Sequence, residues 1–368
     1  MRVIFFTGKG GVGKSTISCA TAARIAGNGK KVIIASLDLA HNLRDILGKE
    51  LKRANIHLIE FDPDCELRRA WNGIYKFIKD FIESQGIEEI YAEEMVLLPG
   101  MEEVLFFISL LNIIESKKYD VIIVDGPPTA SSLKFLSLPE NFKWYKDKFF
   151  SRTSKRYIRV KPIMEKYFYT PLPDRTFIQN IENTYEKILR LHSILKDPSI
   201  TSFRIVTVPS EVAFNETLRL YSVLSIFEYP VDGIILNRFS EDEEIFNRLK
   251  AIFFPLPVLV LDELKKEPLG INSLTYIGHK IYKDYQPDDF LSHIQPFKVV
   301  KRNNSTTIEF FLPGIKKEEI EMWIDGNELV IKSGAFKRIL FLRGNGKMRL
   351  SDVKFSDGRL RISLARNA

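Results

Sequence analysis

Apolar residues in the first 285 positions form short continuous runs that alternate with longer stretches of helical periodicity. The runs are rich in β-branched residues and predict strands at residues 3–7, 31–36, 57–61, 120–125, 204–209, 233–238 and 257–262. Helical periodicity fills residues 15–28, 71–84, 102–116, 175–195, 213–227 and 271–285. Strands that alternate with helices in this way predict an α/β fold, with a mostly parallel sheet covered by helices.

The period changes from 3.6 to 2 after residues 285–297, where two prolines and an acidic turn indicate a linker. Short alternating segments follow, with Asp-Gly pairs at 325–326 and 357–358 as hairpin turns. We therefore expect an α/β domain over residues 1–290, containing a helical insertion at about 65–118 and 138–197, and a small all-β sandwich over residues 296–368.

Composition excludes several classes of protein. The longest apolar run, at 104–114, is shorter than the roughly 20 residues that span a bilayer, and no signal-peptide pattern precedes the first strand, so we expect a cytoplasmic protein. Cys19 and Cys65 cannot form a disulfide framework, and neither has the spacing of a zinc ligand. Residues 143–169 contain nine basic and two acidic residues, and this local excess of +7 equals the net charge of the whole chain.

The segment GKGGVGKS at residues 8–15 satisfies G-x-x-x-x-G-K-[ST] and stands between a predicted strand and a predicted helix. In such a loop, backbone N–H groups surround the β-phosphate, Lys14 contacts the β and γ oxygens, and the Ser15 hydroxyl binds Mg²⁺. We therefore expect ATP and Mg²⁺ as cofactors of a P-loop NTPase. The predicted nucleotide contacts are Gly8, Lys9, Gly10, Gly11, Val12, Gly13, Lys14, Ser15 and Thr16.

Lys9 is a second lysine that an ordinary P-loop lacks. The form K-G-G-V-G-K-S resembles the deviant P-loop ATPases, which include the MinD, ParA, nitrogenase iron-protein and arsenite-pump families. In these families the lysine reaches across a dimer interface and stabilises charge on the γ-phosphoryl group of the partner's nucleotide. The resemblance implies a homodimer, with Lys9 as a catalytic residue.

Two further segments resemble the arsenite-pump and tail-anchored-protein-targeting branch. LDLAHNLRD at 37–45 is similar to its switch I, with Leu39 in place of proline; the resemblance implies that Asp45 orients the attacking water and that Asp38 lies near the magnesium ion. DGPPTASSLKFLSLP at 125–139 is similar to its switch II, with Gly126 among the departures, and implies that Asp125 contacts a magnesium-bound water.

LPGMEE at 98–103 resembles another segment of this branch, and Asn237 stands where the branch has its adenine-contacting asparagine. The resemblance covers residues 1 to about 285. However, the thiolate cluster of arsenite pumps and the zinc-binding C-x-x-C of the eukaryotic targeting factor are both missing.

The basic stretch at 143–169 also contains eight aromatic residues and leaves several interpretations open. In the first interpretation it lines a groove for a hydrophobic client segment, as mobile helices do in the targeting ATPases. In the second it lies on an anionic membrane surface. In the third it binds nucleic acid through stacking and phosphate contacts. An ordinary helical cover with solvated charges is the fourth interpretation.

The last seventy or so residues resemble the α-crystallin domain of small heat-shock proteins, in FFLPGIKKEEIEMWIDGNELVIKSG at 310–334 and VKFSDGRLRISLAR at 353–366. Taken together, the resemblances imply a homodimeric ATPase that chaperones or targets hydrophobic membrane-protein segments. The alternatives are a ParA- or MinD-like positioning ATPase that binds DNA or membrane, and an arsenite-transport ATPase.

Overall fold

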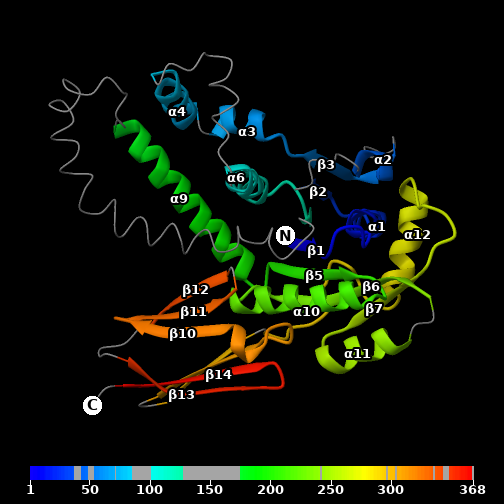
Figure 1. Ribbon diagram of the computed structural model, residues 1–368. Helices are drawn as coiled ribbons and strands as arrows, with labels where there is room; N and C mark the ends of the chain where they lie inside the picture. The colour runs from blue at the N-terminus through cyan, green and yellow to red at the C-terminus, as the bar shows by residue number, and fades with distance from the viewer. Residues whose placement is uncertain are drawn as a thin grey trace. The chain divides into compact units, whose positions relative to one another are not determined.

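The computed structural model describes residues 1–36, 43–48, 54–70, 72–84, 101–126, 175–240, 243–295, 297–302, 305–334, 336–342 and 348–366 of the 368-residue chain. All seven strands predicted for the first part of the chain form. They are β1 Arg2–Thr7, β2 Val32–Ser36, β3 Ile56–Glu60, β4 Val121–Asp125, β5 Thr201–Thr207, β6 Val231–Phe239 and β7 Val258–Asp262. They make one parallel sheet in the order β3-β2-β4-β1-β5-β6-β7, so the predicted α/β class is confirmed (Figure 1).

The position of a strand in the sheet explains how continuous its run of apolar residues is. The central strands β1, β2, β4 and β5 are buried at every residue, whereas the edge strands β3 and β7 alternate between covered and more exposed residues. β5 begins at Thr201, three residues before the predicted start, because Thr201 and Ser202 pair with β1 and are buried despite their polar side chains.

Five helices of the α/β part are described: α1 Lys14–Gly27, α2 Leu43–Leu47, α10 Glu211–Ile226, α11 Glu243–Phe253 and α12 Ile271–Tyr282. α1 packs along α12, and α10 packs on β5. Ser210 begins α10 as a side-chain cap that accepts a hydrogen bond from the Ala213 backbone. The short α2 and the helix α11 were not predicted.

Residues 61–116 and 138–193 form a separate compact unit. Its described helices are α3 Pro63–Ala70, α4 Asn72–Ser84, α6 Met101–Ser116 and the first part of α9 Arg175–Lys196. α6 is buried on several sides, at eight positions from Val104 to Ile114, and packs against α3. Within the described residues, no helix combines the length and the apolar character needed to cross a membrane.

The C-terminal part consists of two antiparallel sheets, as predicted. One contains β10 Ile320–Asp325, β11 Glu328–Ser333 and β12 Phe336–Phe341; the other has the order β13-β14-β9-β8, with β13 Met348–Ser356, β14 Arg359–Arg366, β9 Ser305–Phe311 and β8 Phe297–Arg302. Asp357 and Gly358 form the two-residue loop between β13 and β14, both with positive φ, which is the geometry that favours Asp-Gly.

α10 lies between the parallel sheet and the C-terminal strands, in contact with both β5 and β9 (Figure 1). A Cβ at Gly314, in the turn after β9, would lie 2.3 Å from the backbone carbon of Leu218 on α10. The Gly314 N–H donates to the Ser222 hydroxyl at 2.9 Å, and the rings of Tyr221 and Phe311 meet edge to face. The C-terminal strands are therefore packed against the α/β domain through α10.

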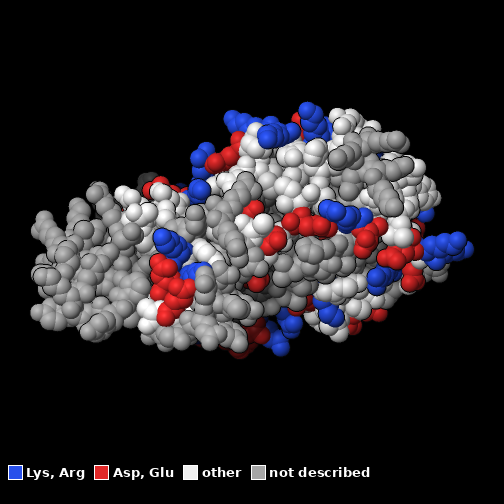
Figure 2. Space-filling view, turned by 90° about the horizontal axis from the view of Figure 1, so that it is seen from above, with Lys and Arg blue, Asp and Glu red and all other residues white. Residues whose placement is uncertain are grey.

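Several sequence predictions concern residues outside the described part. Asp38, most of switch II and the whole basic stretch at 143–169 belong to this group. On the described part of the face drawn in Figure 2, acidic and basic side chains are intermixed. This agrees with a net charge that comes mainly from the basic stretch.

Candidate functional site: a phosphate-binding loop at the end of β1

The segment from Gly8 to Gly13 joins the carboxyl end of β1 to the amino end of α1. A Cβ on Gly8 would lie 2.1 Å from the carbonyl oxygen of Val206 on β5, so no larger residue fits there. Gly13 has φ 91°, and a Cβ there would lie 2.4 Å from Nδ2 of Asn237. The two glycines thus allow the loop to pass close to β5 and β6, which fixes its path.

The amino end of α1 has several features that favour the binding of an anion. Its N-cap is Gly13, which has no side chain to bond the first backbone N–H groups, and the first turn contains no acidic residue. Lys14 is the first residue of the helix and is 9 % exposed, and its Nζ lies 3.3 Å from the Lys9 carbonyl oxygen. N–H groups without a side-chain cap, the helix dipole and the Lys14 ammonium therefore all favour a phosphate at this end of the helix.

Ser15 and Asp125 come together from neighbouring elements. Ser15 Oγ donates a hydrogen bond of 2.6 Å to Asp125 Oδ2, and Asp125, the last residue of β4, is 1 % exposed. The contact arises because β4 pairs with β1, so that their carboxyl ends lie at the same edge of the sheet. A hydroxyl beside a carboxylate is a set of hard oxygen donors, the type that Mg²⁺ prefers.

The close approach of β4 to β1 explains why residue 126, where the sequence departs from the switch II pattern, is a glycine. Its N–H donates to the Phe6 carbonyl at 2.9 Å, and a Cβ at this position would lie 2.5 Å from the same oxygen. Here β4 passes so close to β1 that a side chain would push the two strands apart. The glycine therefore maintains the approach that brings Asp125 to Ser15.

Asn237 braces the phosphate loop from β6. Its Nδ2 donates to the Val12 carbonyl at 2.8 Å, and its Oδ1 accepts from the Arg238 N–H at 2.9 Å. The residue is 7 % exposed and lines a pocket of about 270 Å³ together with Gly13, Thr16, Leu261 and other residues. The position predicted for an adenine contact therefore lies beside the loop, with part of its amide group already bonded to the loop backbone.

The loop after β7 completes this pocket, although the sequence had not indicated that this loop belongs to the site. Leu264 and Pro268 provide apolar wall, and Glu263, Lys266 and Glu267 are polar lining residues. The rule that ligands bind beyond the carboxyl ends of parallel strands would have identified the segment, because it directly follows the strand ending at Asp262. Apolar walls next to a phosphate cradle suit a flat heterocyclic base.

The residues present therefore fit a magnesium nucleotide. The loop contributes backbone N–H groups and Lys14, the neighbouring strand contributes Asp125 beside Ser15, and the pocket is lined in part by Gly13 and Thr16. When bound, the nucleotide supplies the phosphoryl group that is transferred, and Mg²⁺ supplies charge neutralisation for that group.

The structure does not bring Asp45 into this group. Asp45 is an exposed residue in the first turn of α2, and among the described residues no hydrogen bond or ion pair connects it to the phosphate loop. Lys9 is half-buried at the loop. Val12 is 2 % exposed, so it contributes to the site through its backbone.

The two cysteines are separated and differ in character. Cys19 is buried in α1, where burial and the nearby Asp125 carboxylate raise the pKa of its thiol; Cys65 is exposed at α3. Within the described residues, no group of three His, Cys, Asp or Glu side chains is arranged as a metal site. Nothing in the described part therefore resembles a thiolate cluster.

Comparison with known proteins identifies the family of this chain. Residues 1–283 match the model of the anion-transporting ATPase family, and residues 303–364 match an HSP20-like domain found in that family. A putative arsenical pump-driving ATPase 1 of Aquifex aeolicus is 33 % identical over 93 % of this chain and 94 % of its own length. A putative arsenical pump-driving ATPase of Prosthecochloris vibrioformis is 29 % identical over 93 % of this chain and 90 % of its own.

A more distant relative has a different name. The ATPase GET3A of Arabidopsis thaliana is 25 % identical over 80 % of this chain and 88 % of its own length. The resemblances that the P-loop, the switch segments and the C-terminal strands suggested are thus confirmed. The chain is an ATPase that belongs to the anion-transporting ATPase family and carries the HSP20-like domain of that family.

Proposed function

We propose that this ATPase works as a homodimer in which ATP, bound with Mg²⁺ near the subunit interface, closes the two protomers on each other. The proposal is based on the side chain of Lys9. Its carbonyl oxygen accepts from Lys14, but its half-buried side chain makes no hydrogen bond or ion pair with any described residue. An ammonium group at a phosphate loop that is not bonded to its own chain can contact a nucleotide held by a partner.

Within each protomer the proposed roles follow the chemistry of phosphoryl transfer. Backbone groups from Gly8 to Thr16 hold the phosphates, with Lys14 on the β and γ oxygens. Ser15, Asp38 and Asp125 hold Mg²⁺ directly or through water. Asp45 orients the attacking water, and because it is exposed on a five-residue helix, nucleotide binding has to bring α2 toward the loop. Asn237 fixes the loop and borders the base.

The proposed purpose is to chaperone or target hydrophobic segments of membrane proteins, following the resemblance to the tail-anchored-protein-targeting ATPases. The client surface would come from the helices around residues 71–116 and 138–195. Among its described residues, Phe81 of α4 is 42 % exposed, while α6 is largely buried. Access to α6 therefore requires a rearrangement of these helices, which the free energy of ATP-driven closure would drive.

The two alternatives receive less support. Arsenite transport would need several thiolates at one site, yet the chain has two cysteines, of which Cys19 is buried with a raised thiol pKa. A ParA-like role would depend on residues 143–169, which lie outside the described part. The nine basic residues of the same stretch also suit an anionic membrane surface, and we rank nucleic acid below it as a partner.

The experiment measures mass in solution and retention of a client together. The full chain is mixed with Mg·ATP, with Mg·ADP or without nucleotide, and its mass is determined in the presence of a labelled apolar helical peptide and of a polar helical peptide of equal length. A dimer that forms or tightens with ATP and retains only the apolar peptide supports the proposal. A protein that stays monomeric with ATP, or holds both peptides equally, contradicts it.

A further inference from the structure

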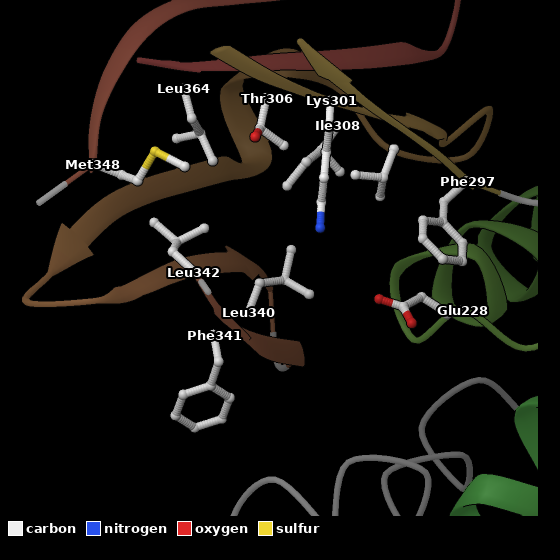
Figure 3. Close-up of a pocket in the computed structure, with 11 residues that line it drawn as sticks. Glu228, Phe297, Lys301, Thr306, Ile308, Leu340, Phe341, Leu342, Met348 and Leu364 are labelled. Carbon is white, nitrogen blue, oxygen red and sulfur yellow. The ribbon is translucent and has the colours of Figure 1, made fainter. Parts of the chain in front are cut away.

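A cavity of about 200 Å³ opens between the two sheets of the C-terminal part, with Glu228, which follows α10, at one end; none of its lining residues belongs to the phosphate loop (Figure 3). Its upper wall comes from the four-stranded sheet, with Ile308 of β9 and Leu364 of β14 pointing into the space. Its lower wall comes from the end of β12, where Leu340 and Leu342 point toward the opposite sheet while the Phe341 ring points away. The interior of the cavity is therefore mainly aliphatic.

The size of the cavity limits what it can hold. An engineered cavity of roughly 150 Å³ with aliphatic walls stays free of water and takes up benzene, so this cavity suits an alkyl chain of about six to eight carbons. Met348, whose unbranched thioether adapts to irregular shapes, lies at one end of it. The cavity is too small for a large cofactor, since typical small-molecule sites span roughly 300–1,000 Å³.

The opposite end of the cavity is polar and positively charged. The Lys301 amino group of β8 points into the opening, is exposed, and forms no ion pair with a described residue (Figure 3). Glu228 lies beside it, but its carboxylate already contacts Arg338 at 2.7 Å and Lys196 at 3.6 Å. Glu228 thus pairs with two other cations and does not neutralise Lys301.

The two partners of Glu228 are covered to different degrees, because Arg338 is buried and Lys196 is half-buried. Arg338 is 6 % exposed, and burial lowers its pKa to about 10, which still leaves it charged near neutral pH. Burial also lowers the pKa of Lys196, against the effect of Glu228. Because these two cations already occupy Glu228, the Lys301 ammonium is the group at the opening that a further anion would contact.

We propose that this cavity binds a medium-chain carboxylic acid, with its alkyl chain between β9, β12 and β14 and its carboxylate at Lys301. The alkyl chain matches the aliphatic walls and the volume, and the carboxylate matches the positive end. Neither nucleotide binding nor the dimer is needed for this site, so it stands independently of the proposed function.

The test uses the full chain and a series of straight-chain acids from butanoate to dodecanoate, with binding followed by calorimetry. Each added CH₂ up to octanoate should tighten binding roughly threefold to fourfold, and longer chains should gain little more. Octanol and octylamine, which share the chain but lack the negative charge, should bind at least about fivefold more weakly than octanoate. Equal binding of octanoate and octylamine would overturn the proposal.

Two variants test the position of the ligand. Lys301→Glu should weaken octanoate binding roughly fivefold to tenfold. Its control is Lys298→Glu, the same change of charge on an exposed residue of the same strand that faces the other side, which should have little effect. Leu342→Trp fills the cavity from a half-buried position at the end of β12 and should abolish binding while the ATPase rate is kept. Octanoate affinity that is unchanged in both Lys301→Glu and Leu342→Trp would place the ligand elsewhere.

Discussion

Arg204 and Asp232 form a bidentate ion pair in the interior of the α/β domain. Nε of Arg204 lies 3.1 Å from Oδ1, and Nη2 lies 3.1 Å from Oδ2, with both side chains at most 1 % exposed. The remaining guanidinium N–H groups donate to the Tyr282 hydroxyl and to the carbonyl oxygens of Pro287 and Asp289. This one arginine therefore fixes the segment that leads from α12 to the C-terminal strands.

Removing one partner of this pair should strongly destabilise the protein. Burial by itself lowers the pKa of Arg204, but Asp232 and the Tyr282 hydroxyl raise it above the ordinary value, so the guanidinium stays charged. Arg204→Met should lower the free energy of unfolding by about 3–5 kcal/mol, because Asp232 loses its main partner and two carbonyl groups lose their donor. Urea unfolding followed by circular dichroism measures this loss.

The control for Arg204→Met is Lys30→Ala, which removes an ion pair between Lys30 and Asp288 at the surface of the same segment. It should change the stability by less than about 1 kcal/mol, because one partner is solvent-exposed. Equal effects of the two substitutions would contradict the importance assigned to the buried pair.

Gly126→Ala should weaken ATP binding more than it weakens the fold. The added methyl group would meet the Phe6 carbonyl and move the end of β4, displacing Asp125 from Ser15. We expect the affinity for a fluorescent ATP analogue to fall about tenfold, from the loss of one charge-assisted contact. Gly27→Ala, in α1 with only an ordinary contact of 3.9 Å to Thr275, should leave ATP binding unchanged.

Asn237→Ala should raise the KM for ATP about tenfold with a smaller effect on kcat, because the phosphate loop loses the hydrogen bond at the Val12 carbonyl. The steady-state ATPase rate measures both constants. Asn247→Ala on the exposed side of α11 is the matched control and should behave like the unmodified protein. A KM that stays unchanged in Asn237→Ala would show that the loop keeps its shape without this bond.

Gly314→Ala should loosen the C-terminal strands from α10. A methyl group at this position would overlap the backbone at Leu218 and Arg219, so the turn after β9 has to move away. We expect cleavage by a protease at exposed linker positions to become faster. Ser222→Ala removes the acceptor of the Gly314 N–H and a hydrogen bond to the Leu218 carbonyl but adds no steric overlap, so it should have a smaller effect in the same direction. Unchanged cleavage in Gly314→Ala would contradict the tight packing on α10.

Glu309 provides a prediction about pH. The hydrogen bond from Arg361 lowers the pKa of Glu309 below its ordinary value, although partial burial acts in the other direction. Because the folded-state pKa is depressed, the pair stabilises the fold above the ordinary glutamate pKa, and this stabilisation is lost as the pH falls through the folded-state pKa.

Glu309→Gln should therefore cost less than about 1 kcal/mol at neutral pH, and the cost should decrease as the pH falls from neutral to values below the ordinary glutamate pKa. Thermal unfolding of both proteins over this pH range measures the difference. In an Arg359→Gln, Arg361→Gln background, which removes both arginines that pair with Glu309, the substitution should have little effect at any pH. A cost of Glu309→Gln that does not depend on pH would contradict the ion pair as its source.

The sequence allowed the sheet, most helices and the phosphate loop to be predicted, because each has a local pattern. The strand runs are continuous in apolar residues, and the loop motif follows one of them directly. The start of β5 was misplaced because Thr201 and Ser202 are polar residues that are buried by pairing with β1. β8 was missed for a related reason: Val299 and Val300 are both exposed on an edge strand, so its alternation is absent.

The site could be predicted in part. Ser15 and Asp125 were assigned to the same metal ion, and they lie in hydrogen-bond contact, 110 positions apart in the chain. The bond between Asn237 and Val12 could not be predicted, because it depends on the distance between β6 and the loop. The wall after β7 has no motif of its own, and only the sheet order brings it to the loop.

The central claim is that Lys9 acts on the nucleotide of a partner protomer, and mixing two inactive variants tests it most directly. Lys9→Ala and Asp45→Asn should each have little ATPase activity alone, whereas Lys31→Ala, which changes an exposed lysine outside the loop, should keep full activity. If Lys9 acts in trans, each mixed dimer contains one site with an intact Asp45 and a partner's intact Lys9. An equal mixture should then recover about a quarter of the normal rate. A mixture as inactive as its components would contradict the account. If Lys9 acted within its own protomer, each site of a mixed dimer would lack either Lys9 or Asp45, and no activity would return.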